Sequence, residues 1–134
     1  MKRFQGATHA LLRIVAGLLF ICPGGMKLWG WFGGMPGGGP LPTLMAVAGT
    51  IEFVGGLAIL LGLFTRPIAF LASGEMAVAY FMAHFPQGFW PIKSHGEPAV
   101  LFCFIFLFLS AAGAGPFSLD RALHRDKAAV EAKT

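Results

Sequence analysis

Charged residues are scarce in this chain: they make up 12% of its 134 residues, whereas a typical soluble domain is about 25% charged. Hydrophobic residues make up 56%. A chain of this size buries only a modest share of its surface when it folds, so a soluble globule could not hide so much apolar area. Disorder is excluded as well, because disordered chains combine high charge with little apolar content. The composition therefore predicts a single-domain integral membrane protein.

Several signatures of function are also missing from the sequence. Two cysteines are too few for a disulfide scaffold. The net charge of +4 comes from basic residues at segment ends and in the tail, with no basic-aromatic patch, which argues against nucleic acid as a partner. No phosphate-binding loop, nucleophile elbow or metal-ligand spacing occurs. The sequence therefore predicts no metal site and no cofactor held by a recognisable motif, and it leaves open whether the protein is an enzyme.

Four apolar segments approach the length of about 20 residues that a bilayer-spanning helix needs. They lie at about 7–26, 44–64, 68–85 and 98–115. The connection at 29–40 is rich in glycine and proline, which disfavours a helix there, while the connection at 65–67 is so short that its flanking helices must be antiparallel neighbours. The predicted fold class is all-α, a four-helix transmembrane bundle over residues 1–117, followed by a polar cytoplasmic tail over 118–134.

The basic residues predict the orientation, because cytoplasmic loops carry more lysine and arginine than loops on the other side. With the N-terminus inside, the cytoplasmic side holds Lys2, Arg3, Arg66, Arg121, Arg125, Lys127 and Lys133. The other side holds only Lys27 and Lys93, together with the three tryptophans, which prefer the membrane interface. We therefore expect a multi-pass protein of the bacterial inner membrane with both termini in the cytoplasm.

Three charged residues, Arg13, Glu52 and Glu75, interrupt three successive apolar segments. A charge at the bilayer centre costs about 2.5–3.5 kcal/mol on insertion scales, so it usually faces the bundle interior and a partner. Counted at about 1.5 Å per residue from the expected inner helix ends, Arg13 and Glu75 are nearly level and Glu52 lies one to two turns further out. We predict that Arg13 faces at least one of the two glutamates.

These three charges have two interpretations. In the first, they form an ion pair that fixes the register of the helices. In the second, they form a polar site that binds the head group of a lipophilic ligand or relays a proton. Glu52 is the strongest candidate for the second role, because one arginine cannot fully neutralise two carboxylates, and small residues such as Gly55 and Gly56 let another helix approach it closely.

Two further groups of candidate residues lie toward the opposite side of the membrane. His84, His95 and Glu97 gather where the third apolar segment ends and the fourth begins, as a hydrogen-bonded interfacial cluster or as a polar rim for ligand entry. Cys22 and Cys103 have matching expected depths. They are either inert buried thiols or, if the first and fourth helices are neighbours, a redox pair.

A series of short motifs occurs in order between about residues 9 and 120. They are Gly25-Met26-Lys27-Leu28-Trp29-Gly30, Glu52-Phe53-Val54-Gly55-Gly56, Gly62-Leu63-Phe64-Thr65-Arg66, His84-Phe85-Pro86-Gln87-Gly88, Gly113-Ala114-Gly115-Pro116 and Ser118-Leu119-Asp120. The series resembles the DoxX family of small bacterial membrane proteins, named after subunits of quinone-linked oxidoreductase systems. The resemblance implies a four-helix integral membrane protein. The polar positions Glu52, His84 and Glu97 match the family pattern, and no catalytic role comes with the match.

Two functions are compatible with this sequence. The first is a redox-associated membrane subunit that binds a quinone-like or other lipophilic molecule near the three buried charges. Because the sequence contains no haem, flavin or iron–sulfur motif, that function requires a redox partner protein or a thiol pair. The alternative is a non-catalytic membrane scaffold or lipid-binding module that docks a partner protein. In both cases the chain contacts the lipid bilayer, and a homodimer would cover part of its lipid-facing surface.

Overall fold

The computed structural model describes residues 1–35 and 42–134, and within these residues it is helical, with no strand. The helices are α1 (Lys2–Trp29), α2 (Thr43–Leu61), α3 (Thr65–Ala79), α4 (Pro91–Ser94), α5 (Glu97–Ala112) and α6 (Leu119–Glu131). A 3-10 turn, Trp31–Gly33, follows α1, while a π-helical turn, Tyr80–His84, and a 3-10 turn, Phe85–Gln87, extend α3. The predicted all-α class is confirmed. Part of the glycine-rich connection expected at 29–40 lies outside the described residues.

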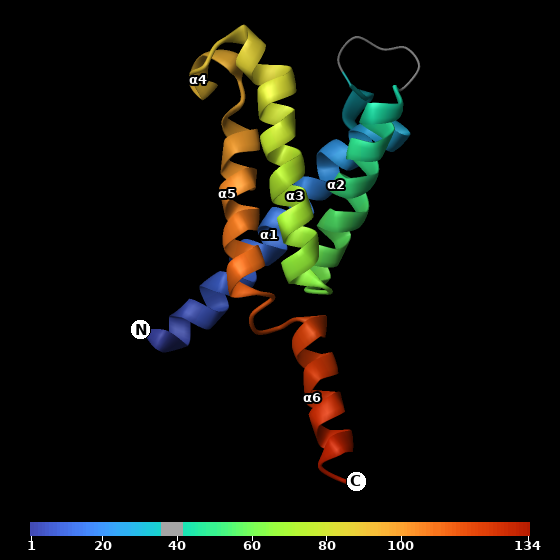
Figure 1. Ribbon diagram of the computed structural model, residues 1–134, viewed down its shortest axis with the longest axis vertical. Coiled ribbons are helices and arrows are strands. Elements are labelled where there is room, and N and C mark those ends of the chain that lie inside the picture. The colour runs from blue at the N-terminus through green and yellow to red at the C-terminus, as the bar shows by residue number, and fades with distance from the viewer. Residues whose placement is uncertain (36–41) are drawn as a thin grey trace.

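The helix ends differ from the expected ones where a residue with positive φ intervenes. α2 ends at Leu61 because Gly62, at φ 72°, adopts a left-handed cap whose N–H returns to the helix. α5 ends at Ala112, before Gly113 at φ 83°. α1 begins at Lys2, five residues before the apolar segment, because helix formation does not require apolar residues. The first two turns of α1 extend beyond the other helices (Figure 1).

Among the described residues, three helices are long and apolar enough to cross a membrane: Lys2–Trp29, Thr43–Leu61 and Thr65–Gln87. The fourth apolar helix, α5, has 16 residues and is therefore about 24 Å long, somewhat less than the hydrocarbon core of about 30 Å. Large apolar side chains point outward from these helices, as at Phe70 and Phe104. Such side chains are stable against lipid and would be costly in water.

The helices associate as two antiparallel pairs, α1 with α2 and α3 with α5, which Figure 1 shows as α3 and α5 side by side and α1 crossing behind. Glycines spaced by seven residues bring the first pair into backbone contact: Gly17 and Gly24 on α1, and Gly49 and Gly56 on α2. A Cβ atom added at Gly24 would lie 2.5 Å from the backbone nitrogen of Phe53. No larger residue fits this seam without separating the helices.

The second pair is joined by side chains and not by glycine. The Ser73 hydroxyl on α3 donates a hydrogen bond to the Cys103 carbonyl on α5 at 2.8 Å. Phe20 of α1 packs edge-on against Phe106 of α5, with ring centroids 4.6 Å apart, and also contacts Phe102. Phe20 and Phe106 are fully buried, so this aromatic cluster holds the two helix pairs together.

The two ends of the bundle differ chemically. We call the end that contains the α2–α3 turn and the segment 113–120 the arginine end, because Arg13, Arg66 and Arg121 lie there. The opposite end is the tryptophan end, where α1 ends and where α3 connects to α5; it contains Trp29, Trp31 and Trp90. Helix α6 extends from the arginine end away from the bundle (Figure 1), and every residue after Asp120 is exposed.

Candidate functional site

A buried ion pair joins α1 to α2 inside the bundle. The Lys27 ammonium donates to both carboxylate oxygens of Glu52, at 2.7 Å to Oε1 and 2.6 Å to Oε2. The side chain of Glu52 is only 2% exposed and that of Lys27 11%. Gly49, one turn before Glu52, provides the space, because a Cβ atom there would lie 2.9 Å from Cβ of Lys27. The glycine seam therefore places this lysine beside the carboxylate.

Glu75 on α3 lies beside this ion pair and interacts electrostatically with both Glu52 and Lys27. Glu52 precedes Gly62 by ten residues and Glu75 follows Thr65 by ten residues, so each lies about 15 Å from the α2–α3 turn and the two are level. The Oε2 atom of Glu75 is buried and has no hydrogen-bond partner among the described residues. Lys27, Glu52 and Glu75 form what we call the carboxylate cluster.

The carboxylate cluster has one cation for two carboxyl groups. The ammonium of Lys27 donates to both oxygens of Glu52, and within the described residues no ion pair joins it or any other cation to Glu75. An uncompensated carboxylate is costly in a membrane interior. Glu75 therefore requires a proton, a cation or a hydrogen-bonding ligand, and it is the group in this cluster that is free to exchange one of these.

Arg13 does not face either glutamate, and that prediction was wrong. Its side chain is fully buried at the arginine end, where Nη2 donates to the Phe117 carbonyl at 2.7 Å and the guanidinium packs against Gly62. Glu52 precedes Gly62 by ten residues, so it lies about 15 Å along α2 from the end where Arg13 is buried. The depth was misjudged because Arg13 lies level with Gly62 at the α2–α3 turn, which marks the end of the bundle, so counting inward from residue 7 placed Arg13 too deep in the membrane.

Asp120 completes a second buried junction at the arginine end. Its carboxylate accepts hydrogen bonds from the backbone N–H of Phe64 at 2.8 Å and of Thr65 at 3.0 Å, so it caps the N-terminus of α3 from outside the helix. Its own N–H donates to the Gly62 carbonyl at 2.9 Å. The positive charge of Arg13 faces this carboxylate. The junction fixes the segment before α6 onto the α2–α3 turn.

Aromatic rings cover the end of the α1–α2 pair near the carboxylate cluster. Phe53, the residue after Glu52, packs edge-on against Trp29 and Trp31, with centroids 4.5 and 5.6 Å apart. The Trp31 ring lies directly over Gly25, where any side chain would collide with it. These rings shield the Lys27–Glu52 pair from the tryptophan end of the bundle.

The residues expected to form a rim do not form a joint site. The His84 ring hydrogen-bonds through Nδ1 to the Ser94 carbonyl at 2.9 Å, which fixes the chain between α4 and α5. His95 and Glu97 are exposed, and within the described residues no ion pair or hydrogen bond joins either of them to His84. The part of the chain that the structure describes contains no group of three potential metal ligands.

The two cysteines are free thiols in separate surroundings. The Cys22 thiol lies 3.6 Å from the Leu18 carbonyl of its own helix, whereas the Cys103 sulfur lies 3.6 Å from the Ser73 hydroxyl on α3. Both are half-buried. The redox pairing of Cys22 with Cys103 stays a prediction.

Sequence reasoning missed two residues that complete the buried charge centres. Lys27 was counted as a flanking residue of the membrane surface, although it follows Gly24 by three residues and so shares the helix face that meets α2. That spacing was a usable signal. Asp120 was treated as part of a polar tail, and no local pattern shows that it caps a helix more than 50 residues earlier in the chain.

Comparison with known proteins places this geometry in a family context. The DoxX family model matches residues 8–85. A Haemophilus influenzae protein described only as uncharacterized is 43% identical over 125 residues, covering 90% of this chain and 93% of its own length. The Escherichia coli inner membrane protein YqjF is 30% identical over 135 residues, covering 93% of this chain and 98% of its own. No solved structure matches significantly.

Proposed function

The chain belongs to the DoxX family, and from that premise we propose that it is a redox-associated membrane subunit whose carboxylate cluster binds the polar head group of a quinone-like or other lipophilic molecule. It is a multi-pass protein of the inner membrane. The resemblance noted from the sequence motifs is thereby confirmed at the level of the family. What we propose beyond the family and the membrane location is the reaction and the class of ligand.

The observation that carries this proposal is the unpartnered oxygen of Glu75. It is a buried polar atom on an apolar helix, beside an ion pair that is already complete. A neutral carboxyl group has one O–H donor and can still accept a hydrogen bond. A quinone head group presents carbonyl oxygens, which accept such a donor. The residues present therefore fit this class of ligand.

The roles of the three residues follow from their contacts. Lys27 holds the Glu52 carboxylate and leaves Glu75 as the group that contacts the ligand. Reduction of a quinone to a quinol takes two electrons and two protons. We propose that the two electrons come from a partner protein of the flavin or iron–sulfur class. Glu75 passes one proton to the carbonyl oxygen that it contacts and regains it from water, and the other carbonyl oxygen takes the second proton from water.

Purification in mild detergent with native lipid tests this function. Lipophilic molecules extracted from the purified protein are identified and quantified by mass spectrometry. We expect a quinone-like molecule with the wild type and about fivefold less with Glu75→Leu, which removes the hydrogen-bond donor, a change of about 1 kcal/mol of binding free energy. Glu97→Leu, which removes an exposed carboxylate at the tryptophan end, is the matched control and retains the ligand. Equal retention by all three proteins contradicts the proposal.

The proposed topology has four spans, with α5 as the fourth and both termini in the cytoplasm. The arginine end then faces the cytoplasm, in agreement with the excess of basic residues there. A reporter fused after Thr134 should be active in the cytoplasm, and one inserted at Gly88 should be active in the periplasm. Activity of both reporters on the same side would contradict the four-span topology.

The alternative function, a membrane scaffold or lipid-binding module that docks a partner protein, is favoured by one observation. Helix α6 presents Leu119, Leu123 and Val130 to solvent, at 43%, 49% and 65% exposure, and these residues share one face of the helix. Truncation after Ala122, which keeps Asp120 and removes Leu123 and Val130, should abolish partner capture under this function. If the truncated protein still co-purifies with a quinone, the two functions are separable. A homodimer would appear as a doubled mass in native mass spectrometry.

A further inference from the structure

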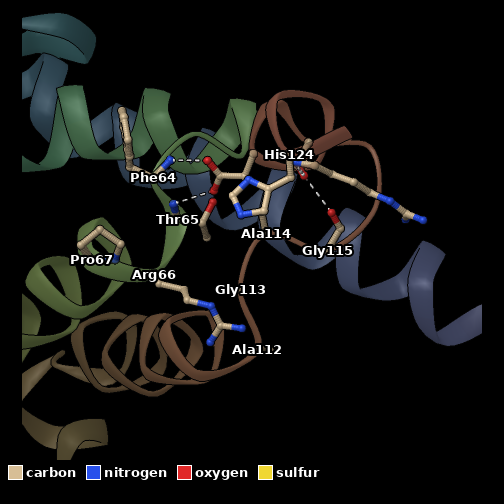
Figure 2. Close-up of a pocket in the computed structure, with 12 residues that line it drawn as sticks. Phe64, Thr65, Arg66, Pro67, Ala112, Gly113, Ala114, Gly115 and His124 are labelled. Carbon is tan, nitrogen blue, oxygen red and sulfur yellow. Dashed lines mark hydrogen bonds between the residues drawn. The ribbon is translucent and has the colours of Figure 1, made fainter. Parts of the chain in front are cut away.

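A cavity of about 420 Å³ opens at the arginine end (Figure 2). The aromatic rings near the carboxylate cluster lie at the opposite end of the bundle. The cavity lies between the first turn of α3, the segment that follows α5 and the first turns of α6. Its volume is in the range of ligand-binding pockets. Its apolar wall is formed by Phe64, Pro67 and Ala114. Three basic side chains also line it: Arg66, Arg121 and His124.

Arg66 is held in place by one part of its guanidinium and leaves the other part available. Its Nη1 donates to the carbonyls of Ser110, at 3.3 Å, and Ala111 at the end of α5. Its Nε and Nη2 face Gly113, where an added Cβ would lie 3.2 Å from each atom. No carboxylate in the described part of the chain forms an ion pair with Arg66. The remaining donors therefore have the fixed geometry that suits a phosphate.

The acidic group in the cavity wall does not cancel these charges. Both oxygens of Asp120 accept hydrogen bonds from the N-terminus of α3, and buried Arg13 faces the same carboxylate from behind. Arg121 and His124 on α6 form no ion pair with any described residue. The groups that face the cavity thus carry a net positive charge, available to an anion.

We propose that this cavity binds the phosphate group of an anionic phospholipid. The cavity lies beside the first turn of an apolar helix that is long enough to span the membrane, so it is at the depth where lipid head groups lie. Its apolar wall is adjacent to the cations, as the glycerol and first acyl carbons of a lipid require. The site uses none of the residues of the carboxylate cluster and does not depend on the function proposed for that cluster.

Native mass spectrometry of the full chain in detergent tests the proposal by titration with phosphatidylglycerol or with phosphatidylcholine. The key variants are Arg121→Gln, which removes a cation from the cavity wall, and Arg125→Gln, which removes the same charge one turn further along α6 and outside the cavity. Both side chains are exposed, so neither change is expected to prevent folding. We expect Arg121→Gln to weaken phosphatidylglycerol binding by about five- to tenfold, and Arg125→Gln to change it by less than about twofold.

Three outcomes overturn this assignment. Equal affinity for phosphatidylglycerol and phosphatidylcholine would show that the anionic charge is not recognised. Equal weakening by the two arginine substitutions would mean that α6 attracts lipid only through its total charge. Inorganic phosphate that binds as tightly as phosphatidylglycerol, and displaces it, would identify a site for free phosphate and not for lipid. A preference for phosphatidylglycerol that depends on Arg121 and survives millimolar phosphate supports the lipid site.

Discussion

Two buried charge centres lie in the same bundle and are built in different ways. At the arginine end, the Asp120 carboxylate is satisfied by two backbone N–H groups and Arg13 binds a backbone carbonyl. In the carboxylate cluster, Lys27 and Glu52 satisfy each other, while an oxygen of Glu75 has no partner. The first centre ties the chain segments together. The second contains a group that a ligand can complete.

This difference shows that burial of a charge does not by itself identify a functional site. Arg13 is the most completely enclosed of the charged side chains, yet its contacts are with the backbone that connects the helices. Glu75 is less buried. Within the described residues both side chains have buried polar atoms without a hydrogen-bond partner, Nε and Nη1 of Arg13 and Oε2 of Glu75. What distinguishes Glu75 is that it has no opposite charge of its own in the described part of the chain, whereas Arg13 faces the carboxylate of Asp120. The predictions below separate the two centres through their effects on stability and on binding.

The largest loss of stability is expected for Arg13→Leu. The substitution removes the charged hydrogen bond to the Phe117 carbonyl, the cation that faces Asp120 and the packing of a fully buried side chain, losses that together we expect to cost about 3–5 kcal/mol. Thermal unfolding in detergent measures the effect. Arg3→Leu removes an exposed arginine from the same helix and should leave the unfolding temperature nearly unchanged. Similar losses for both variants would show that the junction does not hold the fold.

Glu52→Gln should cost somewhat less, about 2–4 kcal/mol, because it leaves the ammonium of Lys27 with a neutral amide. The double variant Lys27→Met, Glu52→Leu should recover much of that loss, since apolar replacement of a buried ion pair is often tolerated. A double-mutant cycle on unfolding free energies, with Lys27→Met as the other single variant, gives the coupling. Strictly additive losses would mean that the pair does not form in the membrane.

Asp120→Asn is expected to cost about 1–2 kcal/mol. The change keeps one acceptor for the N-terminus of α3 but removes the second and the negative charge that faces Arg13. Its control is Asp126→Asn, an exposed change on the same helix that should have no measurable effect. If the two aspartate variants unfold at the same temperature, Asp120 does not cap α3.

Glu75→Leu should have the smallest effect on stability, below about 1 kcal/mol, because the buried Oε2 has no hydrogen-bond partner to lose among the described residues and leucine has a similar volume. Its effect on binding should nevertheless be the largest of the four. Comparison of unfolding temperature with ligand retention for each variant shows whether the two centres differ in function. Loss of stability comparable to that of Glu52→Gln would place Glu75 in the structural network instead.

The sequence was sufficient to predict the all-helical class, the membrane environment and the family. Composition and the apolar segments predict the helical class and the membrane environment, and the ordered motifs indicate the family. The motifs also turn out to build the two charge centres: the segment with Lys27 meets the one with Glu52, and the segment with Thr65 meets the one with Asp120.

The contacts between those segments could not be predicted with the same success. The pairing of Arg13 depended on where α1 enters the bundle, which hydropathy does not reveal, because the apolar segment begins at about residue 7 whereas Arg13 is level with the α2–α3 turn. The cap provided by Asp120 is a tertiary contact with no local sequence signal. Lys27 was accessible to reasoning from the spacing of the glycines, since Gly24 and Gly17 define the helix face that it shares.

The most direct test of the central claim measures stability and ligand binding on one protein preparation. Glu75→Leu and wild type are titrated with a short-chain quinone in detergent, and each is then unfolded thermally. The account predicts nearly equal unfolding temperatures and quinone affinity lower by about fivefold or more in the variant, a difference of about 1 kcal/mol. Equal affinity with an unchanged unfolding temperature would contradict it, because Glu75 would then be neither a ligand contact nor a structural requirement.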